Sequence, residues 1–408
     1  MQTKPPALTP LDGGVTAPAG FVATGIACGI KASGNRDLML LASDRGPVPA
    51  AAIFTTNLAK AAPLLVSEEH LAASGHHAAV VVTNSGCANA CTGPQGLADA
   101  QEMAALAAAA LGCQPEQALV ASTGVIGVNL PMDKLRAGIP AARAALARDG
   151  HADAALAIMT TDPFPKAHAV EATFEGGTFR VGGMAKGSGM IEPRMATMLG
   201  YLTTDAAVPP ALLRRALVEA SADTFNAITV DGESSTNDCV FALASGASGV
   251  IIDETTQHVL VAALRAVARE LALAIVRGGE GASKLVEITV TGAASMEDAR
   301  TAARVIANSP LVKTAVHGGD PNWGRLIAAA GRSGVPFVLA HARVEVGDLV
   351  LFDQGQPHDE RASAAEQHLA GTDIRLAVDL GTGGHGRAVM YTCDLSAEYV
   401  RINADYRT

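Results

Sequence analysis

Aromatic side chains are scarce in this sequence, making up only 3% of 408 residues, with a single tryptophan. The buried interior is therefore expected to consist mainly of alanine, valine, leucine and isoleucine. Charged residues are also few, at 17%, and the 30 basic residues are outnumbered by 40 acidic ones. A net charge of −10 argues against a nucleic-acid partner, because nucleic acids bind to basic surfaces.

Long apolar runs are missing too. No stretch of about 18 apolar residues is present, so no membrane span and no membrane partner are expected. The first residues, "MQTKPPALTPLDGG", lack the apolar segment of a secretion signal and are expected to form an extended arm. Six cysteines are too few for a disulfide framework in a chain of this length. A cytoplasmic location with reduced cysteines follows as the expectation.

Motifs for metals and nucleotides are incomplete. Cys87 and Cys91 are separated by three residues and lack a second pair of ligands, and no H-E-x-x-H is present. The stretch "GTGGHG" at 381–386 matches G-x-G-x-x-G, but a dinucleotide site needs a helix directly after it. The following "RAVMYTC" has the composition of a strand, so we expect a turn there. The sequence predicts no metal and no cofactor.

Apolar runs alternate with helical periodicities, which predicts a mixed α/β fold. The clearest helix has a stripe of apolar residues spaced 4, 3, 4 and 4 apart, and glycines follow it: Leu260, Leu264, Val267, Leu271 and Ile275. Helices are predicted over 96–112, 211–224, 256–277 and 296–307. Strands are predicted over 78–84, 285–291, 335–352, 373–380 and 387–393, with a hairpin over 171–181.

One stretch, "KGSGMIEPRMATMLGYLTTDA" at 186–206, has two interpretations. Thr197 sits in an apolar run and suits a buried strand. Alternatively, it is a nucleophile that becomes the first residue of a new chain. Its hydroxyl would attack the carbonyl of Ala196, and water would cleave the resulting ester. The new α-amino group, with an ordinary pKa of about 7.7–8.0, would then serve as the base that a threonine hydroxyl needs. The residues alone leave both interpretations open.

The stretch "GGMAKGSGMIEPRMATMLGYLTTDA" resembles the signature of the glutamate N-acetyltransferase/ornithine acetyltransferase family of arginine biosynthesis. The resemblance covers nearly the whole chain. Further blocks follow in the family's order: "GIKASGNRDLMLLASD", "NSGCANACTG", "ASTGVIG", "AIMTTD", "TVDGESSTND", "VRGGEGASK", "HGGDPNWGR" and "YVRINADYRT".

This resemblance implies a fold and an assembly. The expected fold is a layered α/β sandwich of the ornithine acetyltransferase/DmpA-like type, with a smaller C-terminal α/β domain from about residue 293. Self-cleavage between Ala196 and Thr197 would give an α chain, 1–196, and a β chain, 197–408. These halves would stay together in an α2β2 heterotetramer.

The resemblance also assigns roles to individual residues. Thr197 matches the nucleophile, while Thr123 and Gly124 match the oxyanion hole. Lys186 matches a contact to the substrate's α-carboxylate, and Glu280 matches a contact to the side-chain ammonium of ornithine. The remaining matched substrate contacts are Thr160, Asn403 and Thr408.

The implied reaction moves an acetyl group from N2-acetylornithine to glutamate through an acetyl-Thr197 intermediate. Acetyl-CoA stays open as a second donor. Two alternatives remain: an N-terminal-nucleophile amidase or aminopeptidase that uses water as acceptor, and a non-catalytic amino-acid-binding protein that is never cut. The chain departs from the family pattern at Cys87, Pro163, Glu192 and Arg194.

Overall fold

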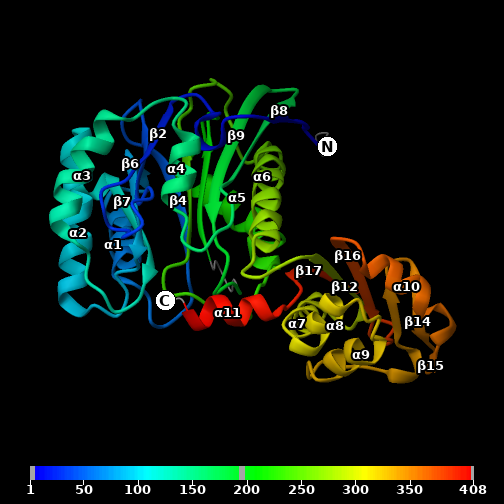
Figure 1. Cartoon of the computed structure of the whole chain (residues 1–408). Coiled ribbons are helices and arrows are strands. Elements are labelled where there is room, and N and C mark those ends of the chain that lie inside the picture. The colour runs from blue at the N-terminus through cyan, green and yellow to red at the C-terminus, as the bar shows by residue number, and fades with distance from the viewer. Residues whose placement is uncertain (1–4, 193–197, 406–408) are drawn as a thin grey trace.

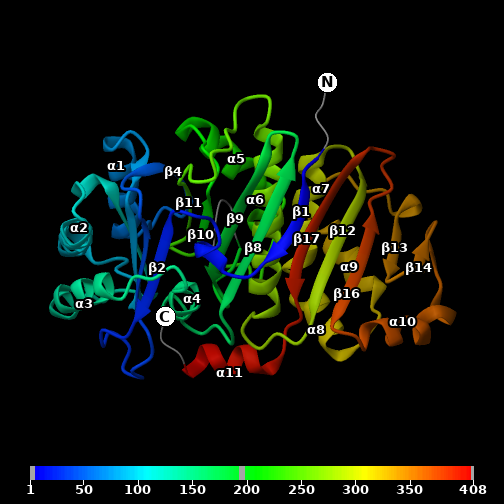
Figure 2. The ribbon, with the colours of Figure 1, turned by 90° about the horizontal axis from the view of Figure 1, so that it is seen from above.

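The structure is a computed structural model that describes residues 5–192 and 198–405 (Figure 1). The expected cleavage site at Ala196 and Thr197, the departure at Arg194 and the expected contact Thr408 lie outside the described residues. Within the described part, the strands form three sheets. Two of them stack in a main body, and the third belongs to a C-terminal unit beside it (Figures 1 and 2).

The main body contains a seven-stranded and a four-stranded sheet. In spatial order, the larger sheet consists of β1 (Ala7–Leu11), β8 (Lys166–Phe174), β9 (Gly177–Lys186), β10 (Leu199–Thr204), β11 (Cys239–Ala244), β4 (Val48–Phe54) and β5 (His77–Ala78). The smaller sheet consists of β2 (Phe21–Ile26), β3 (Leu38–Ser43), β6 (Val80–Cys87) and β7 (Ala118–Val125). The pairs β10–β11 and β6–β7 are parallel, which brings their carboxyl ends to the same edge of each sheet.

Helices cover the outer faces of the two stacked sheets. The four-stranded sheet packs against α1 (Ala62–Ala73), α2 (Gly93–Leu111) and α3 (Met132–Ala144). The seven-stranded sheet packs against α5 (Pro210–Ala222) and α6 (Gln257–Arg277). The short helix α4 (His151–Ala157) contacts β2. The body is therefore a four-layer sandwich, helices–sheet–sheet–helices.

The pattern on β3 explains why this sandwich forms. Leu38 and Leu40 point into the core beneath the helices, whereas Met39 and Leu41 point into the core between the sheets. Because successive side chains of a strand face opposite sides, a strand covered on both faces is apolar at every position. All six residues of β3 are accordingly buried.

The C-terminal unit has its own core on one face of a six-stranded sheet. The strands, in spatial order, are β15 (Gln356–Pro357), β14 (Leu349–Asp353), β13 (Arg343–Val346), β16 (Asp373–Asp379), β12 (Leu285–Ala293) and β17 (Gly386–Cys393). The helices are α7 (Met296–Ala307), α8 (Pro310–Gly318), α9 (Trp323–Gly331) and α10 (Ala362–Leu369). After β17, helix α11 (Ala397–Asp405) runs back beneath the main body (Figure 1).

The mixed α/β layered fold is confirmed. The four predicted helices occur as α2, α5, α6 and α7, and the hairpin occurs as β8 and β9. The prediction of strand from residue 335 was wrong for 335–342, where a short 3-10 turn at Leu339–His341 precedes β13. Of the predicted N-terminal arm, Ala7–Leu11 is extended and pairs with β8 as strand β1, whereas Gly14–Thr16 forms a 3-10 turn. The domain boundary near residue 293 stays a prediction; β12, which ends at Ala293, is already part of the C-terminal sheet.

No helix of the described part is long and apolar enough to span a bilayer.

A buried hydrogen bond joins the two sheets of the body. The hydroxyl groups of Tyr201 and Thr83 lie 2.8 Å apart, and both residues are fully buried. We predict that Tyr201→Phe lowers the free energy of unfolding by about 1–2 kcal/mol, because the Thr83 hydroxyl loses its partner. The double variant Thr83→Val/Tyr201→Phe should recover part of that loss. Thermal unfolding of the purified variants measures both effects, and equal midpoints for wild type and Tyr201→Phe would contradict the prediction.

Candidate active site

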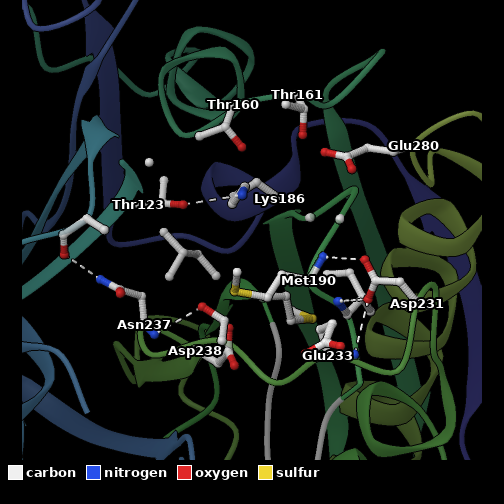
Figure 3. A pocket seen from close by; sticks show the side chains of 18 of the residues that line it. Thr123, Thr160, Thr161, Lys186, Met190, Asp231, Glu233, Asn237, Asp238 and Glu280 are labelled. Carbon is white, nitrogen blue, oxygen red and sulfur yellow. Dashed lines mark hydrogen bonds between the residues drawn. The ribbon is translucent and has the colours of Figure 1, made fainter. Parts of the chain in front are cut away.

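A pocket opens beside the ends of β7, β9 and the start of β10 (Figure 3). Its walls come from segments that are far apart in the sequence. The six predicted site residues within the described part all line it: Thr123, Gly124, Thr160, Lys186, Glu280 and Asn403. Met198 and Leu199, which directly follow Thr197, line it too. The fold thus brings the predicted residues together, while their individual roles stay predictions.

Thr123 and Lys186 face each other across the pocket (Figure 3). The Lys186 Nζ atom donates a hydrogen bond to Thr123 Oγ1 at 3.3 Å. Since an ammonium group can only donate, the Thr123 oxygen acts as acceptor and its own O–H remains able to donate elsewhere. This arrangement suits a hydroxyl that stabilises a developing negative charge.

Gly124 is required by a close approach of two backbones. Its φ angle is +128°, and a Cβ atom there would lie 2.3 Å from the carbonyl carbon of Gly86. A side chain at this position would therefore separate the ends of β6 and β7. Glycine keeps both strand ends in contact and leaves backbone, not a side chain, at the pocket wall.

Asp162 fixes two walls of the pocket, although sequence reasoning did not single it out. One carboxylate oxygen accepts from Gly187 N at 2.7 Å and from Lys166 Nζ at 2.6 Å, and the other accepts from Thr160 N at 3.0 Å. Burial by itself raises the pKa of Asp162, but Lys186 and Lys166 outweigh that effect and lower the pKa to about 2. The block "AIMTTD" contains this aspartate, and the two lysines that neutralise it lie at positions 166 and 186.

Glu280 lies in the loop after α6 and is 7% exposed. Its carboxylate accepts a hydrogen bond from Asn403 Nδ2 at 2.7 Å, so α11 returns from the C-terminal unit to complete this wall. Gly189 makes room for the same group, because a Cβ there would lie 2.4 Å from Glu280 Oε2. The last glycine of "KGSG" is thus explained by the carboxylate packed against it.

Asp231 holds the backbone that leads toward the expected cleavage site. Its carboxylate accepts from Met190 N at 2.7 Å and Ile191 N at 2.8 Å, and Tyr399 donates to it at 3.1 Å. Met190 has a φ angle of +56°, which is unfavourable for a residue with a side chain. Sequence reasoning missed Asp231; the only signal was its place before a glycine in "TVDGESSTND".

Two of the departures from the family pattern have structural partners. Glu192 is 8% exposed and forms an ion pair with Arg304 of α7 at 3.1 Å. Cys87 is buried, and its sulfur lies 3.1 Å from the carbonyl oxygen of Val128. Glu192 therefore ties the segment before the cleavage site to the C-terminal unit.

Metal ligands do not gather in the part of the chain that the structure describes, where no three His, Cys, Asp or Glu side chains form a metal-binding group.

Known proteins are similar to this chain over nearly its whole length. The model of the ArgJ family matches residues 22–408. The arginine biosynthesis bifunctional protein ArgJ of Symbiobacterium thermophilum is 52% identical over 403 residues, which are 98% of this chain and 99% of that protein. Its counterpart from Chlorobaculum tepidum is 47% identical over 406 residues, covering 99% and 100% of the two chains.

A solved structure is also similar. It is the crystal structure of the arginine biosynthesis bifunctional protein ArgJ from Bacillus halodurans, with 39% sequence identity and a TM-score of 0.50. The match covers 52% of this chain and 100% of the solved one. Because the family model matches nearly the whole sequence and the relatives are similar over their full lengths, the chain belongs to the ArgJ family.

Proposed function

We propose that the chain transfers an acetyl group from N2-acetyl-L-ornithine to L-glutamate, as a glutamate N-acetyltransferase/ornithine acetyltransferase of arginine biosynthesis. The observation that carries this proposal is the single pocket that gathers six predicted site residues beside Met198. Lys186 is the only basic residue among those that line the pocket in the described part. Both substrates have an α-carboxylate, so one lysine can position either of them.

The proposed mechanism has two steps. The Thr197 hydroxyl attacks the acetyl carbonyl, and the α-amino group of the same residue takes the hydroxyl proton. The Thr123 hydroxyl and the Gly124 N–H stabilise the oxyanion, and each such donor contributes about 3–4 kcal/mol. The α-ammonium group then returns the proton to the leaving nitrogen. Ornithine departs, and the acetyl group stays on Thr197 as an ester. The amine of glutamate then attacks the ester, giving N-acetylglutamate and the free hydroxyl.

This mechanism requires cleavage between Ala196 and Thr197, because only a chain terminus provides the α-amino group. The similarity to the solved Bacillus halodurans chain supports it, since that whole chain matches 52% of this one. The expected fragment 197–408 also makes up 52% of this sequence, the same share that the solved chain matches.

Four further features belong to the same proposal. Acetyl-CoA is a candidate second donor, consistent with the word "bifunctional" in the names of the relatives. The cleaved halves assemble as an α2β2 heterotetramer, and the enzyme works in the cytoplasm. No metal or other cofactor takes part in the two steps.

The first prediction concerns the covalent chemistry. The purified wild-type protein should appear in intact-mass analysis as fragments 1–196 and 197–408, and acetylornithine should add one acetyl group to the second fragment. Thr197→Ala should remain a single, inactive chain, whereas Thr197→Ser should keep partial cleavage. Release of free acetate without glutamate would indicate a hydrolase instead. An active, uncut enzyme would overturn the proposal.

The second prediction tests the oxyanion contact. Thr123→Val keeps the shape of the side chain but removes the hydroxyl, so kcat should fall roughly 100- to 1,000-fold. Thr123→Ser, the matched control, retains a hydroxyl and should lose far less activity. Steady-state kinetics and thermal unfolding of both variants provide the measurement. Equal kcat values for Thr123→Val and Thr123→Ser would remove this hydroxyl from the mechanism.

The third prediction concerns Asp162. Asp162→Asn leaves the fully buried Lys166 without a carboxylate, so unfolding should become easier by roughly 3–5 kcal/mol. Adding Lys166→Met removes the buried charge and should restore much of the stability, as measured by thermal unfolding.

Acetyl transfer should stay slow in this double variant. The introduced amide offers one carbonyl oxygen, whereas the carboxylate of Asp162 accepts from Thr160 N and Gly187 N on two separate oxygens. Recovery of both stability and activity would show that Asp162 has no positioning role.

A further inference from the structure

Asp238 is a buried carboxyl group that the mechanism above does not use. It directly precedes β11, lines the pocket and is 3% exposed. Figure 3 shows it on the wall opposite Thr160 and Thr161. Ser235 forms a side-chain hydrogen bond with the carboxyl group, but Oδ2 has no hydrogen-bond partner among the described residues. A buried polar atom without a partner is costly, which makes this oxygen unusual.

Most of the charged groups around Asp238 interact with other partners. Lys186 acts on it through its charge, but the hydrogen bond from Lys186 goes to Thr123. Three other acids line the pocket. Asp231 accepts from backbone N–H groups, Glu280 accepts from Asn403, and Glu233 is exposed. The neighbouring Cys239 thiol is buried and neutral, because burial raises its pKa well above the ordinary value.

Burial also raises the pKa of Asp238 well above its ordinary value, more than the charge of Lys186 lowers it. The neutral carboxyl is therefore favoured as long as no further cation is near. A cation placed beside Oδ2 would reverse that preference.

The strand register identifies the source of such a cation. Strands β10 and β11 are parallel, with Leu199 opposite Cys239, and Cys239 N donates to the Met198 carbonyl at 2.9 Å. Asp238 therefore lies beside Met198. Thr197 directly precedes Met198 in the sequence.

We propose that Asp238 is the positioning residue that pairs with the α-amino group of Thr197 once self-cleavage has released it. This proposal rests on the proposed function. Cleavage breaks the bond between the Ala196 carbonyl carbon and the Thr197 nitrogen; water supplies the hydroxyl for Ala196 and a hydrogen for the amine. The Asp238 proton then moves to the new amine, which gives a carboxylate and an ammonium side by side.

The pair then acts in acetyl transfer. When the ammonium has lost its proton, the amine takes the proton of the Thr197 hydroxyl during attack, and the Asp238 carboxylate stabilises the ammonium that forms. The same carboxylate raises the pKa of the amine. The rate of acetyl transfer therefore rises with pH around a pKa that is higher than the pKa of an unpaired amine. Without the carboxylate, that pKa falls and the amine becomes a weaker base.

The experiment compares Asp238→Asn with wild type and with Asp133→Asn, a matched substitution at an exposed position in α3. Asparagine resembles the neutral carboxyl of the uncut chain, so Asp238→Asn should be cut as completely as wild type. At high pH, where the amine is unprotonated in both enzymes, formation of the acetyl-enzyme from acetylornithine should be roughly tenfold slower or more. The rising limb of its pH profile should move to lower pH by about one unit or more. Asp133→Asn should behave like wild type in all three measurements.

Several results would overturn the proposal. The Asp238→Asn chain could remain uncut, or the rising limb of its pH profile could stay at the wild-type pH. A change confined to the KM of acetylornithine would also overturn the proposal, because it would assign the carboxylate to the substrate's ammonium. If Asp238→Asn fails to fold, NMR of the wild-type enzyme labelled with 15N-threonine measures the amine directly. A pKa at or below the ordinary value of about 7.7–8.0 would also overturn it. The proposed function itself fails separately, if wild type forms no acetyl-enzyme.

Discussion

The buried carboxylate of Asp162 is the interaction on which the pocket depends. It accepts hydrogen bonds from Thr160 N and Gly187 N, and so joins the loop after α4 to the end of β9. Lys166 and Lys186 provide the positive charge that keeps this carboxylate ionised inside the protein. The same attraction acts in the other direction, because the carboxylate offsets the positive charge of the buried Lys186 side chain. One buried acid thus determines the shape of two walls and lies close to the only lysine that lines the pocket in the described part.

The layered architecture explains why residues so far apart in the sequence meet here. Thr123 and Gly124 end β7 of the four-stranded sheet, whereas Lys186 ends β9 and Leu199 begins β10 of the seven-stranded sheet. Stacking the sheets through the core between them brings these ends together, and α11 adds Asn403 from beyond the C-terminal unit. Functional side chains therefore sit at the ends of strands that a large core holds rigid, as precise positioning requires.

Sequence reasoning succeeded where a pattern repeats and failed where a role arises from tertiary contacts. The stripe from Leu260 to Ile275 predicts α6 because one apolar face is visible in the sequence itself. Residues 335–342 are apolar too, yet they form no strand, because composition alone does not reveal which segment finds a pairing partner. Thr123 and Lys186 were found through family resemblance. Asp162, Asp231 and Asp238 were missed because a lone acid carries no signal until the N–H groups and lysines around it are known.

The acids in and beside the pocket differ in which groups compensate their charge. Asp162 is compensated by lysines, Asp231 by backbone and tyrosine donors, and Glu280 by an amide. These three are complete in the folded chain, so they organise the pocket before any bond is cut. Asp238 has an oxygen without a partner among the described residues, next to Met198, which follows the expected cleavage site. Under the proposed mechanism, self-cleavage would create the cation that Asp238 lacks, so that maturation and catalysis would use the same electrostatic arrangement.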